Sequence, residues 1–151
     1  GLALACAPLG AWLAVTGTFE QDFIPILWLA AGVLAWVSGF DLVYACQDEA
    51  FDRKRGLFSV PARFGRRRSL YAARALHVLA VGAFAVQGSL AGLGAIYWIS
   101  LVLAAALLVW EHRLVRTDLS QIDMAFFTAN GWVGVVLFLG VAADLQFAGG
   151  L

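Results

Sequence analysis

Hydrophobic residues in this chain run almost without interruption through five stretches and do not alternate with polar residues. The stretches are Leu2–Phe19, Phe23–Ala45, Leu70–Gln87, Leu90–Trp110 and Ala125–Ala143. A helix that crosses a bilayer needs about 20 mostly apolar residues, and in lipid only helices or closed barrels satisfy their backbone hydrogen bonds. Because the runs are continuous, the pattern predicts an all-α integral membrane protein with five transmembrane helices.

Composition supports this prediction. Of the 151 residues, 62% are hydrophobic and 13% are charged, whereas a soluble domain has about 25% charged residues. These values argue against a water-soluble globule and against a disordered chain. The two cysteines, Cys6 and Cys46, have no metal-ligand spacing, and we expect no disulfide between them.

The charged residues are unevenly distributed along the chain. Ten basic residues balance ten acidic ones, but seven of the basic ones lie within Gln47–Arg68. Between two apolar spans, such a run indicates a cytoplasmic loop rather than a nucleic-acid-binding segment. The connection Glu20–Asp22 is acidic, Gly88-Ser89 reads as a short uncharged turn, and Glu111–Asp123 carries two arginines. This alternation predicts a cytoplasmic N-terminus and an outside C-terminus, with the lipid bilayer as a partner and no nucleic acid.

Carboxylates gather where the second span ends. At about 100° per residue, Asp41, Asp48 and Asp52 fall within about 40° of each other, with Tyr44 on the same side, so the spacing predicts that these carboxylates line one face of a helix that runs out of the bilayer. Carboxylates near hydrocarbon cost about 2.5–3.5 kcal/mol each, and like charges at i,i+4 repel. A cation is therefore expected. Oxygen ligands without Cys or His favour Mg²⁺, which shares its shell with water and phosphates. The basic loop that follows suits a diphosphate.

A simpler interpretation of these acidic residues stays open at this stage. Asp48, Glu49 and Asp52 could form a solvated helix end that the following Arg53–Arg55 run balances. For Glu49 this interpretation is favoured, because its side chain points off the shared face. Asp41 favours a functional interpretation of the other carboxylates, because apolar residues surround it.

The segment has a recognisable motif. Asp41–Gly65, read DLVYACQDEAFDRKRGLFSVPARFG, resembles the second aspartate-rich motif of the UbiA family of intramembrane aromatic prenyltransferases. The family pattern Y-A-x-x-D-x-x-x-D-x-x-x-G-x-x-S is matched by Tyr44, Ala45, Asp48, Asp52, Gly56 and Ser59. The Gln47-Asp48 pair and Ser59–Gly65 look like the 4-hydroxybenzoate polyprenyltransferase-like branch, which includes the enzyme of the futalosine route to menaquinone.

The resemblance implies an activity and roles for individual residues. Asp48 and Asp52 would hold Mg²⁺ that bridges to the diphosphate of a polyprenyl donor, with Asp41 and Tyr44 as catalytic-site neighbours. From charge and position, Lys54 and Arg63 are candidate contacts to the diphosphate. The implied reaction transfers a polyprenyl group from polyprenyl diphosphate to an aromatic acceptor in ubiquinone or menaquinone biosynthesis. The acceptor is 4-hydroxybenzoate or a related aromatic acid.

The resemblance also implies a larger protein. Family members have nine spans, so residues 1–151 are expected to be a partial domain that supplies spans five to nine of the bundle. The family's earlier motif, N-D-x-x-D-x-x-x-D, does not occur in this chain. We therefore expect it to lie in a preceding part, and we expect the isolated chain to be inactive. The expected location is the bacterial inner membrane, with Gln47–Arg68 on the cytoplasmic side.

Two other classes of protein compete with this interpretation. A transporter or channel fragment with an acidic cytoplasmic gate would explain Asp41 within a span, but it gives no reason for the motif spacing. A CDP-alcohol phosphotransferase also pairs membrane carboxylates with Mg²⁺, but its D-G-x-x-A-R signature is absent from this sequence.

Three further polar residues receive structural interpretations. His77 lies inside the third span and is predicted to serve in helix contact or hydrogen bonding rather than in a metal site. His112 is predicted to be interfacial, and Asp144 to be a solvated helix end.

Overall fold

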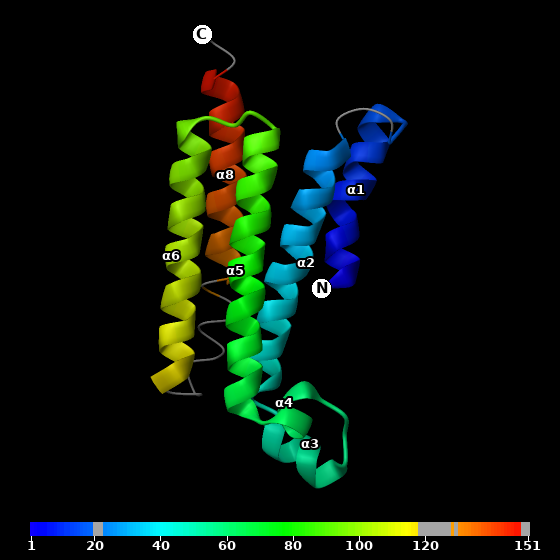
Figure 1. Ribbon diagram of the computed structural model, residues 1–151, viewed down its shortest axis with the longest axis vertical. Coiled ribbons are helices and arrows are strands. Elements are labelled where there is room, and N and C mark those ends of the chain that lie inside the picture. The colour runs from blue at the N-terminus through cyan, green and yellow to red at the C-terminus, as the bar shows by residue number, and fades with distance from the viewer. Residues whose placement is uncertain (20–22, 118–127, 129, 149–151) are drawn as a thin grey trace.

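The computed structural model describes residues 1–19, 23–117, 128 and 130–148, and its regular elements there are α-helices. The elements are α1 (Leu2–Thr16), α2 (Phe23–Ala45), α3 (Glu49–Arg55), α4 (Val60–Phe64), α5 (Arg66–Leu90), α6 (Ala95–Thr117) and α8 (Asn130–Ala148). The long helices run lengthwise, and α3 and α4 lie together at one end of them (Figure 1). The prediction of an all-α membrane fold is confirmed.

Four helices, α2, α5, α6 and α8, are long and apolar enough to cross a membrane. The helix α1 is apolar but has only 15 residues. Its predicted span extended to Phe19, but the helix ends at Thr16, because Gly17 adopts the left-handed conformation (φ 70°) and its N–H bonds to the Leu13 carbonyl. The described residues therefore contain four spanning helices and one shorter apolar helix, where five spans were predicted.

The remaining predicted boundaries agree unevenly with the structure. The second predicted span coincides with α2. The last predicted span was Ala125–Ala143, of which residues 125–127 and 129 lie outside the described part. From Asn130 onward this span is helical, and α8 continues past its predicted end to Ala148. The third began at Leu70, whereas α5 already starts at Arg66. Long arginine side chains can extend from a helix end toward water, so the basic first turn does not prevent helix formation.

The predicted turn at Gly88-Ser89 is wrong. The helix α5 continues to Leu90, the turn occupies residues 91–94 with Gly92 at φ +66°, and α6 extends past the predicted end at Trp110. Gly88 has a different role, because a Cβ there would overlap the Tyr97 ring. It permits close contact between α5 and α6 instead of making the turn.

Asp144 is not a solvated helix end, as predicted, but a buried cap for α6. Its carboxylate accepts hydrogen bonds from the N–H groups of Gly94 (2.6 Å) and Tyr97 (3.3 Å). The first N–H groups of a helix have no partner within the helix, so a carboxylate placed there satisfies them and interacts favourably with the helix dipole. Only 2% of Asp144 is exposed, so α8 and α6 are joined by a buried polar contact.

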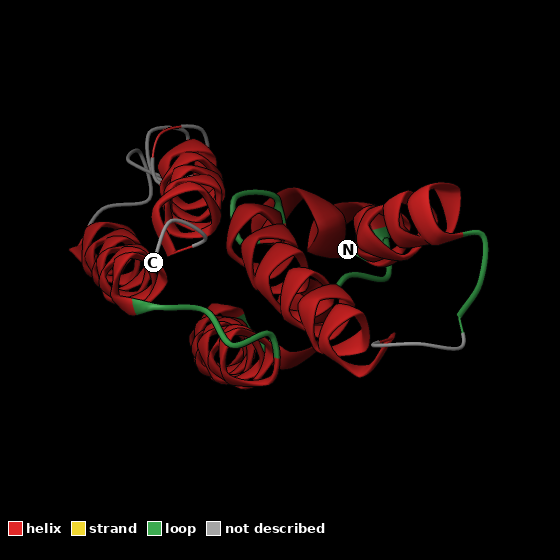
Figure 2. Ribbon diagram, turned by 90° about the horizontal axis from the view of Figure 1, so that it is seen from above, coloured by secondary structure: helices red, strands yellow, loops and turns green. Residues whose placement is uncertain are grey.

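Small residues bring the spanning helices together. A Cβ at Gly32 would overlap the Phe84 ring, and one at Gly39 would overlap the His77 ring, so α2 approaches α5 closely at both positions. The buried side chain of Phe40 packs with Leu108 of α6 and Val133 of α8. Seen along the bundle, α2, α5, α6 and α8 surround a common interior and α1 lies outside, beside α2 (Figure 2). These contacts fix the position of the segment that follows α2.

Candidate functional site

The helix that carries Asp41 and Tyr44 does not continue to Asp48. It ends at Ala45, and the next three N–H groups each bond to the carbonyl three residues earlier, with Asp48 N–H to the Ala45 carbonyl at 3.2 Å. Such bonds tighten the last turn of a helix and redirect the chain. Asp48 then precedes α3, which contains Asp52. The prediction that three carboxylates share one face of a single helix is therefore wrong.

The residues Cys46–Gly65, here called the cap segment, form two short helices joined by an extended link. Gly56 ends α3 in the left-handed conformation (φ 68°), where a residue with a Cβ would be strained. Ser59 then begins α4, with its Oγ accepting a hydrogen bond from the Ala62 N–H (3.2 Å), and Pro61 lies in the first turn. The motif's Gly56 and Ser59 thus shape the backbone of the cap segment.

Arg53 holds the two short helices together. Its guanidinium pairs with Glu49 within α3 (3.0 Å), and its Nε donates to the carbonyl of Ala62 in α4 (3.0 Å). The interpretation of Glu49 as part of a balanced helix end agrees with this ion pair. Because α3 has only seven residues, this cross-link matters more to its position than helix propensity does.

Asp48 and Asp52 differ from Glu49 in having no ion partner among the described residues. Asp48 is exposed and Asp52 is partly exposed, and within the described residues no basic group lies within ion-pair distance of either carboxylate. Their backbones are linked, since the Asp52 N–H donates to the Asp48 carbonyl (2.8 Å). The start of α3 thus presents two carboxylates that have no ion partner among the described residues.

These two carboxylates fit part of a magnesium site. Mg²⁺ prefers oxygen ligands and is commonly held by one or two carboxylates plus water and substrate phosphates. Across the described ranges, no group of three or more His, Cys, Asp or Glu side chains is placed to hold a metal. The described residues would therefore supply at most a pair of ligands, and the rest of the coordination shell would come from water, a phosphate or another part of the protein.

The other predicted site residues surround this pair less closely. Asp41 is 58% exposed and its carboxylate lies 3.1 Å from the Gly1 nitrogen, so it faces α1. Tyr44 is half-exposed, three residues further along α2. Lys54 and Arg63 are both exposed, and the Arg63 guanidinium lies 5.5 Å from the Phe64 ring centre. The four positions named as catalytic or metal-binding thus lie on either side of one turn, but among the described residues no direct contact joins Asp41 to Asp48.

A hollow of about 350 Å³ lies behind the turn, lined in part by Gln47, Glu49, Arg53 and Arg66. Cys46 is buried at its edge, with its Sγ donating to the Leu42 carbonyl (3.3 Å). Burial raises the pKa of the Cys46 thiol to about 11, against the smaller opposing effect of the Arg66 charge. The thiol is therefore protonated near neutral pH and is a packing residue rather than a nucleophile.

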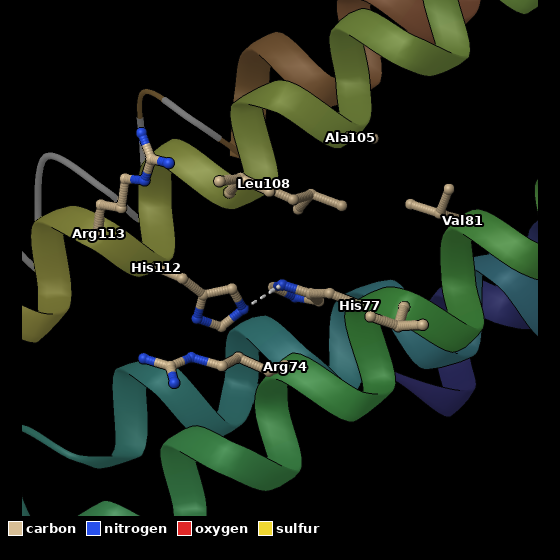
Figure 3. A pocket seen from close by; sticks show the side chains of 9 residues that line it. Arg74, His77, Val81, Ala105, Leu108, His112 and Arg113 are labelled. Atoms are coloured by element: carbon tan, nitrogen blue, oxygen red, sulfur yellow. Dashed lines mark hydrogen bonds between the residues drawn. The ribbon is translucent and has the colours of Figure 1, made fainter.

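A second group of polar residues was not assembled by sequence reasoning. His77 of α5 and His112 of α6 point toward one another, with 3.0 Å between Nδ1 and Nε2 (Figure 3). Glu111 is fully buried, and its Oε2 lies 3.9 Å from His77 Nδ1. These three residues are called the buried polar cluster. The hydrogen-bonding role predicted for His77 is confirmed. His112, predicted to be interfacial, is partly buried and lies near the end of α6.

One sequence signal could have located this cluster. Two antiparallel helices joined by a short turn place residues at similar distances from the turn opposite each other. A turn at residues 91–94 brings His77 opposite the end of α6 that carries Glu111 and His112. Because the predicted turn was misplaced, this pairing was missed.

Comparison with known proteins extends the likeness beyond the cap segment. The model of the "UbiA prenyltransferase family" matches residues 1–142. A "4-hydroxybenzoate octaprenyltransferase" of Hahella chejuensis is 31% identical over 144 residues, which cover 95% of this chain and 43% of that protein. Proteins with the same name from Xanthomonas campestris pv. campestris and Pseudomonas syringae pv. tomato are 36% and 37% identical, over 83% and 74% of the chain. The matched regions cover 42% of the Xanthomonas protein and 37% of the Pseudomonas protein.

No solved structure matches the chain. The chain spans less than half the length of the curated relatives it matches. The family match nevertheless covers both the cap segment and the spanning helices around it, and it favours the prenyltransferase interpretation over the transporter one. The chain therefore belongs to the UbiA prenyltransferase family.

Proposed function

We propose that this chain is the C-terminal part of an enzyme that transfers a polyprenyl group from polyprenyl diphosphate to an aromatic acceptor in quinone biosynthesis. The shorter helix α1 and the four spanning helices would correspond to spans five to nine. The acceptor is 4-hydroxybenzoate or a related aromatic acid. The names of the bacterial relatives support this class of reaction. The single observation that carries the proposal is the pair Asp48 and Asp52, whose carboxylates have no cationic partner among the described residues while the adjacent Glu49 has one.

The arrangement suits cleavage of an allylic diphosphate. Asp48 and Asp52 would hold Mg²⁺, which when bound neutralises charge on the departing diphosphate. Lys54 and Arg63 are exposed in the same cap segment and can add positive charge toward the same anion. Arg53 keeps α3 and α4 in fixed relation, so that these side chains keep their positions.

The apolar helices supply the other half of the chemistry. An allylic cation is quenched by water, so the prenyl chain must lie in a site from which water is excluded. The α1 and α2 helices consist almost wholly of apolar residues, and α2 leads directly to the turn that carries the two carboxylates. Asp41 and Tyr44, on the last turns of α2, would orient the aromatic acceptor between the diphosphate and the prenyl chain.

Location follows from the same features. We propose that the protein lies in the bacterial inner membrane with Gln47–Arg68 on the cytoplasmic side. The concentration of basic residues in this range supports this orientation. Because the chain spans under half of its relatives' length, we propose that the remaining ligands come from the rest of the enzyme and that the 151-residue chain alone is inactive.

The experiment is a prenylation assay with the full-length enzyme in membranes, with and without Mg²⁺. Asp48→Ala and Asp52→Ala are each expected to lower the rate by about 10²–10³-fold, since each removes a ligand of the Mg²⁺ that would neutralise charge on the leaving group. Glu49→Gln is the matched control, because it removes a carboxylate from the same turn and should stay within about threefold of wild type. Full activity in both aspartate variants would overturn the proposed metal site.

A further inference from the structure

Two hollows outside the cap segment meet at one arginine. The first, of about 470 Å³, lies between α5 and α6, and most of its wall is apolar, including Val78, Val81, Ala105 and Leu108. The second, of about 570 Å³, is lined by residues 66, 67, 70, 71 and 74 of α5. Arg74 lines both hollows. In Figure 3, Val81 faces Ala105 and Leu108 across the apolar hollow, and Arg74 lies below it beside His112.

One face of α5 borders both hollows. Arg67, Arg74, Val78 and Val81 are spaced by seven, four and three residues, which at about 100° per residue places them within about 40° of a common line. Arg67 lies in the first turn of α5, at the end of the helix that adjoins the cap segment (Figure 1). Val81 lies about 21 Å further along the helix axis, at 1.5 Å per residue. The face is thus cationic at the end of the span and apolar deeper in.

Among the described residues, three of the arginines that line these hollows have no carboxylate partner. In the part of the chain that the structure describes, no acidic group lies within ion-pair distance of Arg66, Arg67 or Arg74. The Arg67 and Arg74 guanidinium groups instead lie 5.8 and 5.3 Å from the centre of the same Tyr71 ring. Two like charges held around one ring leave an unbalanced positive site.

The position of Arg74 along the spanning helix makes an unpaired positive charge costly. Arg74 lies two turns into α5, about 12 Å beyond Arg66 along the axis. An arginine placed there is costly in hydrocarbon unless an anion or water reaches it. A phosphate that bears an acyl chain would supply the anion at the second hollow, and its chain would cover the apolar walls of the first.

We propose that this face of α5, with the facing part of α6, binds an anionic phospholipid. Its phosphate lies against Arg67 and Arg74, and one acyl chain enters the hollow between Val81 and Ala105. Basic pockets between transmembrane helices on the cytoplasmic side commonly bind acidic lipid headgroups. The site involves α5 and α6, whereas the candidate catalytic turn joins α2 to α3, so the bound lipid is distinct from the proposed prenyl donor.

The test measures lipid binding to the full-length protein in detergent by native mass spectrometry, with phosphatidylglycerol and phosphatidylcholine titrated separately. Phosphatidylglycerol is expected to bind at least tenfold more tightly than phosphatidylcholine. Arg67→Gln with Arg74→Gln should weaken phosphatidylglycerol binding by about thirtyfold. Ala105→Phe, which fills the apolar hollow, should weaken binding of both lipids without changing the melting temperature.

The controls separate this site from general charge and from the catalytic site. Arg68→Gln removes the same charge from a position that lines neither hollow, and should change phosphatidylglycerol binding by less than about twofold. Arg67→Lys with Arg74→Lys keeps the charge and should retain binding within about threefold. Equal affinity for both lipids, an equal loss in Arg68→Gln, or displacement of phosphatidylglycerol by inorganic phosphate or farnesyl diphosphate would each overturn the proposal.

Discussion

The cap segment and the buried polar cluster both place carboxylates beside basic side chains, but they do so in opposite environments. In the cap segment, Asp48 is exposed, Asp52 is partly so, and both lack an ion partner in the described chain. In the cluster, Glu111 is fully buried and lies next to the hydrogen-bonded pair His77 and His112. Exposed carboxylates can accept a ligand at little cost, whereas buried polar groups depend on one another. We therefore expect substitutions in the first region to change activity and those in the second to change stability.

The largest effect is expected from the double variant Asp48→Ala with Asp52→Ala. If the two carboxylates act as one metal-binding unit, the double variant loses about as much prenyl transfer as each single variant, about 10²–10³-fold. Its free energy of unfolding should change by less than about 1 kcal/mol, since the Asp48 side chain makes no cap hydrogen bond. Rate assays and unfolding in sodium dodecyl sulfate measure both quantities. Losses that multiply would indicate independent roles for the two residues.

The buried polar cluster should show the reverse behaviour. His77→Ala leaves a cavity and deprives His112 of its partner, so the free energy of unfolding should fall by about 2–4 kcal/mol. Transfer by the fraction that remains folded should be nearly unchanged. His77→Gln can still donate to the facing side chain and is the control, with about half the loss. A folded but inactive His77→Ala protein would break the contrast between the two regions.

Gly39 tests the contact that buries the cluster. Gly39→Ala introduces a Cβ that would overlap the His77 ring, so α2 and α5 must separate, at a cost of about 1–3 kcal/mol. Gly82→Ala is the matched control on α5, because no atom lies within 4 Å of a Cβ at that position. It should be neutral or stabilising by up to about 1 kcal/mol. Equal melting temperatures for the two variants would contradict the close approach.

The smallest effect is expected at Arg53 in the cap segment. Arg53→Ala removes an exposed ion pair to Glu49 and a hydrogen bond to Ala62, together worth about 1 kcal/mol. Amide hydrogen exchange in α4 should therefore speed up about fivefold, while the spanning helices keep their protection. Arg55→Ala, whose guanidinium lies over Phe51 within α3, is the control. Unchanged exchange in α4 would show that Arg53 does not join the two short helices.

The two regions also differ in how far sequence could predict them. The membrane class and the paired aspartates follow from local signals, namely long apolar runs and a motif within 25 residues. The break after Ala45 was missed, because helical periodicity alone does not reveal where a chain changes direction. The predicted turn at Gly88-Ser89 failed because glycine in a membrane helix also serves close contact, as Gly88 does with Tyr97.

Long-range polar contacts depend on helix register and on correctly placed turns, so the spacing of residues within one segment did not reveal them. Asp144 caps α6 across 50 residues of chain, and the pairing of His77 with His112 depends on the register of α5 against α6. Neither residue type has a spacing that marks its partner. Asp48 and Asp52, by contrast, are four residues apart and share one turn, so their pairing was visible in the sequence, whereas the helix face that they were predicted to share with Asp41 does not exist.

The most direct measurement of the central claim is ³¹P electron–nuclear double resonance on the full-length enzyme with Mn²⁺ in place of Mg²⁺ and pyrophosphate as the probe. Mn²⁺ accepts the same oxygen ligands. We predict phosphorus coupling to bound Mn²⁺ in wild type and in Glu49→Gln, and its loss in Asp48→Asn with Asp52→Asn. Undiminished coupling in the double asparagine variant would contradict the assignment of these two carboxylates to the metal and diphosphate.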